Sequence, residues 1–176
     1  MTKLALFAFV IFQSAWGDTI VGTIVQIKDG DTVVVMDETK QQHTIRFNGV
    51  DCPEKNQAFG NRSKQELIRM LSDKPVTVTW TKHDIFCRRK KDKSKCRKIG
   101  KIVQSDKDIN LAMIENGMCW YYRHYAKDVD PEDRPVYSKA EMNAKATKLG
   151  LWSEPNPTAP WEFRKKNRKK KRQKKN

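Results

Sequence analysis

Apolar and polar residues alternate along the first third of the chain in the pattern expected for β-strands. Residues 19–28, T-I-V-G-T-I-V-Q-I-K, predict one strand, and residues 32–36 and 42–47 predict two more. Asp29-Gly30 lies between the first two strands and is a common hairpin turn, because glycine tolerates positive φ. The polar residues 37–41 form the next turn. The pattern therefore predicts a meander of three strands.

The middle of the chain mixes the periods of strands and helices. Residues 75–80, P-V-T-V-T-W, predict a fourth strand and residues 99–103 a weaker fifth one. Apolar residues at helical spacing predict three helices, at 64–71, 109–116 and 136–149. Five strands with a helix between the third and the fourth predict an α+β domain. We expect a five-stranded OB-fold β-barrel with about three helices.

Capping residues indicate where these helices begin and end. Asn61 or Ser63 is a candidate N-cap for the first helix, and Asp108 is one for the second. Gly117 and Gly150 follow the second and third helices, where a glycine commonly ends a helix.

The N-terminus has the order of a secretory signal peptide. A lysine at position 3 precedes an apolar run at 4–12, and the small residues Ala15 and Gly17 follow. The run is shorter than the roughly 20 residues that span a bilayer. We interpret residues 1–17 as a signal peptide, with Asp18 as the mature start; a buried strand and a membrane anchor are the alternatives. A cleaved signal predicts a secreted or periplasmic protein without stable membrane insertion.

Four cysteines in an exported protein are expected to form disulfides, because the compartment is oxidising. Three pairings are possible. We favour Cys87 with Cys96, which closes a short loop, and Cys52 with Cys119. A zinc site is the competing interpretation, but the spacing lacks the paired Cys-x-x-Cys knuckles of such sites.

Charge and proline divide the C-terminal part. Residues 18–154 form the predicted domain, and the Pro-rich residues 155–163 form a linker. Ten of the twelve residues at 164–175 are basic, so we expect 164–176 to be a disordered tail. The tail is either only solvated or binds nucleic acid. The formal net charge of +15 points to nucleic acid, an anionic membrane or an acidic polymer as the partner.

Acidic residues gather at the predicted strand ends despite this positive charge. Asp31 follows the hairpin, and Asp51 and Glu54 follow the third strand, which also carries Arg46. Hydrolysis of a phosphodiester needs positive charge on the phosphate oxygens and a carboxylate that orients or deprotonates water. A hard cation such as Ca²⁺ prefers oxygen ligands. The cluster therefore predicts a calcium-dependent site for cleaving phosphodiesters.

Several motifs resemble the staphylococcal (micrococcal) nuclease family. They are DGDT at 29–32, IRFNGVDCPE at 45–54, CRKIGKIV at 96–103, INLAMIENGMCWYY at 109–122 and AKATKLGLWSE at 144–154. The resemblance covers nearly all of residues 18–154. It implies an OB-fold barrel with three helices and a calcium-dependent enzyme that cleaves DNA and RNA, leaving 3′-phosphate ends.

The resemblance also implies roles for individual residues. Ca²⁺ would be held by the carboxylates of Asp31 and Asp51 and the backbone carbonyl of Cys52. Glu54 would be the general base or would orient the water. Arg46 and Arg97 would bind the scissile phosphate, for which the planar guanidinium is suited. Arg88, Arg89 and Lys98 compete with Arg97 for that role, and Tyr125 matches an aromatic residue near the nucleotide.

The basic loop RRKKDKSK at 88–95 is expected to contact the nucleic-acid backbone, with Arg88 and Arg89 among its substrate-binding residues. The alternative is a loop kept polar for solubility. Three other functions compete with a monomeric calcium nuclease. They are a nuclease whose metal is held by His43, His83 and His124, a non-catalytic nucleic-acid-binding OB module, and a cationic protein that binds surfaces.

Overall fold

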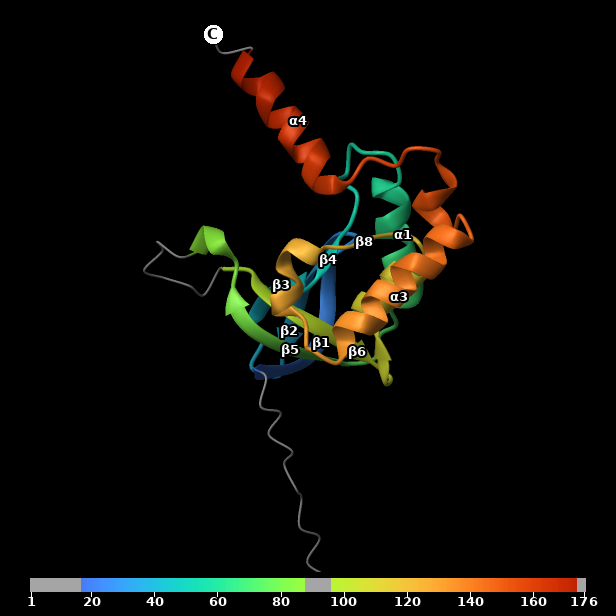
Figure 1. The fold of residues 1–176 in the computed structure, drawn as a ribbon. Coiled ribbons are helices and arrows are strands. Elements are labelled where there is room, and N and C mark those ends of the chain that lie inside the picture. The colour runs from blue at the N-terminus through green and yellow to red at the C-terminus, as the bar shows by residue number, and fades with distance from the viewer. Residues whose placement is uncertain (1–16, 88–95, 174–176) are drawn as a thin grey trace, which may run out of the picture.

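The computed structural model describes residues 17–87 and 96–173, which form a barrel with helices packed against it and a C-terminal helix that projects away (Figure 1). The predicted signal peptide, except Gly17, and the basic loop at 88–95 lie outside the described residues. Residues 174–176 at the end of the expected tail lie outside them as well.

All five predicted strands are present. The strands are β1 (Asp18–Asp29), β2 (Thr32–Asp37), β3 (Gln42–Phe47), β4 (Val50–Asp51), β5 (Val76–His83), β6 (Lys98–Gln104), β7 (Lys107–Asp108) and β8 (Trp120–Tyr121). The prediction missed the two-residue strands β4, β7 and β8, because two residues are too short to show a period.

Five strands close into a barrel. Antiparallel neighbours run in the order β3-β2-β1-β5-β6, and a parallel pairing of β3 with β6 closes the sheet, with Arg46 opposite Ile99. This confirms the expected five-stranded α+β barrel. The short strands β4 and β8 form a second sheet, in which Asp51 pairs with Trp120. That sheet joins the end of the meander to the segment after α2. Asp51 and Trp120 are 69 positions apart in the sequence.

The first three α-helices pack against the body of the protein, and the fourth projects away from the barrel (Figure 1). The α-helices are α1 (Gly60–Met70), α2 (Ile109–Glu115), α3 (Asp133–Ala146) and α4 (Pro160–Gln173), with 3-10 turns η1 (Ile85–Cys87), η2 (Arg123–Asp128) and η3 (Gly150–Ser153). Strand residues such as Val33, Ile45 and Ile102 are fully buried together with Met113 of α2 and Tyr137 of α3. The core therefore lies between the barrel and its helices, and it fixes where the strand ends point.

The capping predictions had different outcomes. Asp108 caps α2 as predicted, because its carboxylate accepts the N–H of Leu111 at 3.0 Å. The predicted caps of the first helix, Asn61 and Ser63, are wrong, since α1 begins at Gly60 after Phe59 in a left-handed conformation with φ 65°. The reason is packing: a Cβ on Gly60 would lie 2.0 Å from the Glu54 carbonyl oxygen, so the helix start is pressed against the loop before it.

The third helix is shifted towards the N-terminus relative to its prediction. It begins at Asp133, where Pro135 is tolerated in the first turn, and it ends at Ala146 rather than near Leu149. Lys148, with φ 52°, reverses the chain before Gly150 is reached. Gly117 has φ 63° and follows α2 as expected.

The basic C-terminal segment differs from its expected disorder. Residues up to Gln173 form α4, and Pro160 occupies the first helical position, where its ring is pre-organised for a helix. Arginine and lysine are good helix formers, and buried Ala159 and Pro160 anchor the start of the helix. The Pro-rich segment is therefore docked rather than free. Within 17–87 and 96–173, none of the helices combines the length and the apolar character needed to cross a membrane.

Candidate active site

The β1–β2 hairpin positions Asp31 beside the third strand. Its carboxylate is almost completely buried, and it accepts the Cys52 N–H at 2.7 Å and the Thr32 hydroxyl at 3.0 Å. The turn needs Gly30 for space, because a Cβ there would lie 2.0 Å from Ser63 Oγ. The sequence analysis explained the glycine of this turn by a positive φ, but Gly30 does not have a positive φ. Close packing against α1 therefore fixes the position of Asp31.

Asp51 lies in β4, and its side chain has no exposed surface. The next residue, Cys52, forms a disulfide with Cys119, and Cys87 forms one with Cys96, so both favoured pairings are confirmed. All four cysteines are thereby used, which leaves no thiolate for the competing zinc site. The first disulfide ties the acidic loop to the segment before β8.

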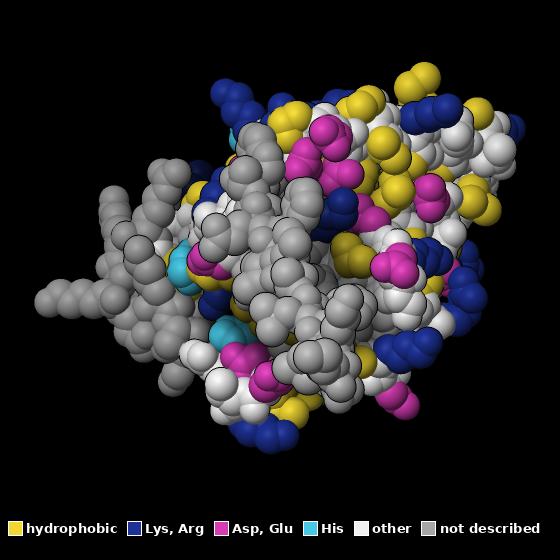
Figure 2. Space-filling view, turned by 90° about the horizontal axis from the view of Figure 1, so that it is seen from below, with side chains coloured by type: hydrophobic (Ala, Val, Ile, Leu, Met, Phe, Trp, Pro, Cys, Tyr) yellow, Lys and Arg dark blue, Asp and Glu magenta, His cyan; other side chains and the backbone are white. Residues whose placement is uncertain are grey.

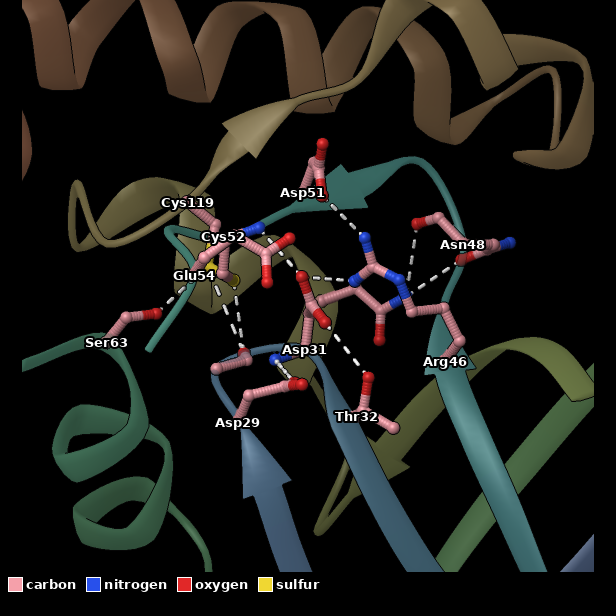
Figure 3. Close-up of polar contacts among 12 residues, drawn as sticks. Asp29, Asp31, Thr32, Arg46, Asn48, Asp51, Cys52, Glu54, Ser63 and Cys119 are labelled. Atoms are coloured by element: carbon pink, nitrogen blue, oxygen red, sulfur yellow. Dashed lines mark hydrogen bonds and ion pairs between the residues drawn. A yellow bond between two sulfur atoms is a disulfide. The ribbon is translucent and has the colours of Figure 1, made fainter. Parts of the chain in front are cut away.

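Arg46 joins the two aspartates. Its guanidinium forms an ion pair with Asp31, and its Nη2 donates to Asp51 Oδ1 at 2.7 Å (Figure 3). Burial lowers the pKa of Arg46, but the charges of Asp31, Asp51 and Asp29 outweigh burial and hold its pKa above the ordinary value. Arg46 therefore stays charged, between two carboxylates, at the end of β3.

A second arginine contacts this acidic cluster from α4. Arg164 donates from Nη2 to Asp51 Oδ2 at 2.7 Å and from Nη1 to Glu54 Oε1 at 2.8 Å. Burial raises the pKa of Asp51, and the guanidinium groups of Arg164 and Arg46 act against that rise. Glu54 is the most accessible of the three acids, with 42% of its side chain exposed. It is thus the acid placed to meet solvent water.

These residues line one cavity of about 390 Å³, which opens between the barrel and α4. Arg97 and Tyr125 also line it, as the resemblance implied. Among the described residues, however, the guanidinium of Arg97 is ion-paired with Asp84 and not with Asp31, Asp51 or Glu54. Arg88 and Arg89 lie outside the described residues. Of the predicted site residues that are described, all lie at one cavity, while their catalytic roles remain predictions.

The donor chemistry of the cavity fits a hard cation. Two buried carboxylates, of Asp31 and Asp51, approach the same guanidinium. The N–H of Cys52, whose carbonyl is the predicted third ligand, donates to Asp31. Oxygen donors of this kind suit Ca²⁺. In the described part of the chain, no three His, Cys, Asp or Glu side chains are gathered closely enough to hold a metal by themselves. A cation would therefore depend on two carboxylates and backbone oxygen.

The histidines do not form a metal site of their own. His43 contacts Asp37 at 2.7 Å and Lys98 at 3.3 Å, and the ring of His124 stacks on Tyr122 at 5.8 Å. His83 lines the cavity without the other two. The histidine-metal hypothesis is therefore wrong for the described residues.

The sequence analysis missed two residues near the acids, Arg164 and Trp161. Both come from the segment P-W-E-F-R, which was divided between the linker and the tail. A signal was available there, because a tryptophan and a phenylalanine at the start of a basic run indicate that the run docks on an apolar surface. Pro160 at a helix start was a second signal.

A cavity lined by carboxylates and arginines beside an OB barrel is the kind of site expected in a protein that cleaves phosphodiesters. Comparison with known proteins points to the same class. Residues 44–154 match the family model described as staphylococcal nuclease homologue. The chain is 33% identical to the micrococcal nuclease of Shigella flexneri, over 91% of this chain and 88% of that protein. It is also 33% identical to protein ParB of Escherichia coli, covering 91% and 87% of the two chains. An uncharacterized endonuclease of Haemophilus influenzae is 33% identical over 80% and 71%.

The chain therefore belongs to the staphylococcal nuclease family. Membership makes it a hydrolase of the endonuclease type. Nucleic acid is the substrate class that goes with this family.

Proposed function

We propose that the protein is a secreted or periplasmic, calcium-dependent nuclease that hydrolyses phosphodiester bonds of DNA and RNA and leaves 3′-phosphate ends. One observation carries the proposal: Asp31 and Asp51 converge on Arg46 at a cavity that Glu54 and Arg97 also line. Family membership supports the same chemistry.

Asp31 and Asp51, with the Cys52 carbonyl, are the residues that would hold Ca²⁺. A calcium ion held there would supply positive charge that neutralises the phosphate oxygens. Arg46 is held in place by its two carboxylate partners, so its remaining donor capacity is oriented before the substrate arrives. Such pre-organised donors stabilise the charge that develops on the phosphate during attack.

Glu54 orients or deprotonates the attacking water. Its exposure of 42% leaves it accessible to solvent, and the Gln57 side chain, which accepts the Glu54 N–H at 3.1 Å, fixes the loop that carries it. Arg97 serves as a second phosphate ligand, for which its ion pair with Asp84 has to be exchanged for a contact with the substrate.

Digestion of plasmid DNA and of RNA in calcium, magnesium or chelator tests this proposal. Wild type should cleave both polymers in calcium, and Arg46→Ala should lose about 10²–10³ in rate, as expected for a lost transition-state donor. Glu54→Gln should lose about 10²–10⁴ because the general base is removed. Exposed Glu115→Gln and Arg69→Ala are matched controls that do not line the cavity and should retain activity.

Two results would contradict the mechanism: cleavage that persists in chelator, and unchanged rates in both cavity variants. If wild type binds nucleic acid but cleaves none with any divalent ion, the non-catalytic OB module is the better description. End-group analysis of the products separates 3′-phosphate from 5′-phosphate ends.

Export and monomeric behaviour are tested on the full-length chain. Expression in a bacterial host should yield a mature protein outside the cytoplasm. Its intact mass should be that of a chain that starts at Asp18. A protein that retains residues 1–17 would contradict the signal peptide. Size-exclusion chromatography with light scattering should give the mass of one chain.

A further inference from the structure

Helix α4 is attached to the body of the protein at its first turn. The Thr158 carbonyl accepts a hydrogen bond from Gln57 Nε2 at 2.5 Å, and Pro160 is buried. The Trp161 ring stacks on Tyr122 with centroids 4.7 Å apart and planes inclined by 10°. The direction in which α4 leaves the barrel is therefore fixed at its root (Figure 1).

The next turns of α4 form one wall of the cavity. Arg164 reaches Asp51 and Glu54, and Arg168, one helical turn further on, also lines the cavity. Residues at positions 164, 168, 171 and 172 share one face of a helix, because side chains three and four positions apart are neighbours. This face, which we call the arm face, begins at the acidic cluster and continues along the helix away from the barrel.

The arm face is purely cationic. Eight of the ten residues at 164–173 are lysine or arginine, and none is acidic or apolar. On the part of the barrel surface seen in Figure 2, by contrast, basic, acidic and apolar side chains are intermixed. Like charges one turn apart destabilise a helix. A polyanion lying along the arm face would relieve this repulsion, whereas a membrane-surface helix needs an apolar face that 164–173 lacks.

The length of the arm corresponds to a short stretch of nucleic acid. Residues 164–172 span about 12 Å at about 1.5 Å per residue. Successive phosphates of a strand that is stacked as in B-DNA lie about 3.4 Å apart along the helix axis, so the arm spans about four phosphates of such a strand.

We propose that α4 is a nucleic-acid-binding arm that holds about four phosphates on one side of the scissile bond and leads the strand into the cavity. This inference rests on the proposed function for the location of the scissile bond. Arg164 is the member of the arm nearest the acids. A substrate phosphate would compete with Asp51 and Glu54 for its guanidinium, so the carboxylates hold Arg164 at the cavity until a phosphate arrives.

The binding test uses a variant of the arm face, Arg168→Gln/Lys171→Gln/Arg172→Gln. Its matched control, Lys74→Gln/Lys107→Gln/Lys139→Gln, removes the same charge from exposed lysines that do not line the cavity. Fluorescence anisotropy with a labelled 12-nucleotide single strand is measured in chelator between about 0.05 and about 0.2 M salt, a range over which counterion release changes affinity strongly.

The plot of log K against log salt has a negative slope, and the arm variant should make it shallower by about 2. Each single-strand phosphate contact contributes about 0.7, and the variant removes three charges. Extrapolated from 1 M salt, this corresponds to binding about a hundredfold weaker at 0.1 M. The control should keep the wild-type slope. An unchanged slope in the arm variant, or an equal change in both variants, overturns the proposal. Tighter binding by the arm variant also overturns it, because α4 would then be blocking the cavity. Binding of wild type to vesicles containing phosphatidylserine but not to the oligonucleotide would assign the arm to membranes instead.

Cleavage in calcium then separates the arm from the proposed function. The arm variant should lose more kcat/KM on the 12-nucleotide strand than on a trinucleotide, which is too short to reach along α4. Equal losses on both substrates contradict the arm. If wild type cleaves neither substrate while the change in salt slope is observed, the nuclease proposal fails and the binding arm stands.

Discussion

Removal of each disulfide separately should destabilise the protein by different amounts. We consider two double variants, Cys52→Ala/Cys119→Ala and Cys87→Ala/Cys96→Ala. All four cysteines are at least 95% buried, so both variants lose similar buried sulfur surface. The difference between them therefore comes from the length of chain that each bridge closes.

The two closed loops differ greatly in length. Cys52 and Cys119 are 67 positions apart in sequence, whereas Cys87 and Cys96 are 9 apart. The entropy of closing such loops in the unfolded chain corresponds to about 4.4 and about 2.6 kcal/mol at about 25 °C. We expect the free energy of unfolding to fall by about 2 kcal/mol more for the Cys52–Cys119 variant. For a domain of this size that is a difference of about 4–8 °C in melting temperature.

Urea-induced unfolding of oxidised wild type and both variants, followed by tryptophan fluorescence and circular dichroism, measures these free energies. Wild type reduced before unfolding provides a reference without either bridge. Equal destabilisation by the two variants would refute loop length as the cause. A larger loss for Cys87→Ala/Cys96→Ala would mean that the short bridge stabilises the folded state by a route other than unfolded-chain entropy.

Three further predictions concern residues around the core and the site. Asp108→Ala removes the α2 cap and the acceptor of the buried Tyr137 hydroxyl at 2.8 Å, so unfolding in urea should show a loss of about 2–4 kcal/mol, with Asp108→Asn losing less. Burial, with repulsion from a neighbouring carboxylate, raises the pKa of Asp29 to about 6. The folded state therefore holds a proton that the unfolded state releases, and stability falls as the pH rises from about 4 to about 6. Asp29→Asn should raise the melting temperature at pH values above about 6 and change it little below about 4; equal shifts at both ends would contradict this pKa. Gly30→Ala should cost about 1–3 kcal/mol in urea titration through its clash with Ser63, and adding Ser63→Gly should restore part of the loss if the clash is the cause.

The barrel was largely predictable because its strands are encoded locally. Period-2 alternation marked β1, β2, β3, β5 and β6, and the hairpin at Asp29-Gly30 fixed the register of the first two. The Asp108 cap was predictable for the same reason, since its partner is three residues away. The errors fall where packing overrides local preference, as at the start of α1, where Gly60 is pressed against the Glu54 loop.

The acidic cluster was also recognisable from the sequence. Asp31, Arg46, Asp51 and Glu54 lie within two short motifs, and strand ends joined by tight turns bring such motifs together. The state of Arg97 was not predictable, because its ion pair with Asp84 depends on how β5 and β6 end beside each other.

The amino-acid order alone specifies the strands, the turns and the types of side chain at the cavity, since these follow from neighbours a few positions apart. The β4–β8 pairing and the contact of Arg164 with Asp51, across 113 positions, follow from the folded shape. The geometry of long-range contacts of this kind is set by the packing of the elements that lie between the partners. For that reason the sequence pattern predicted a disordered tail, whereas the basic segment forms a helix at the cavity in the structure.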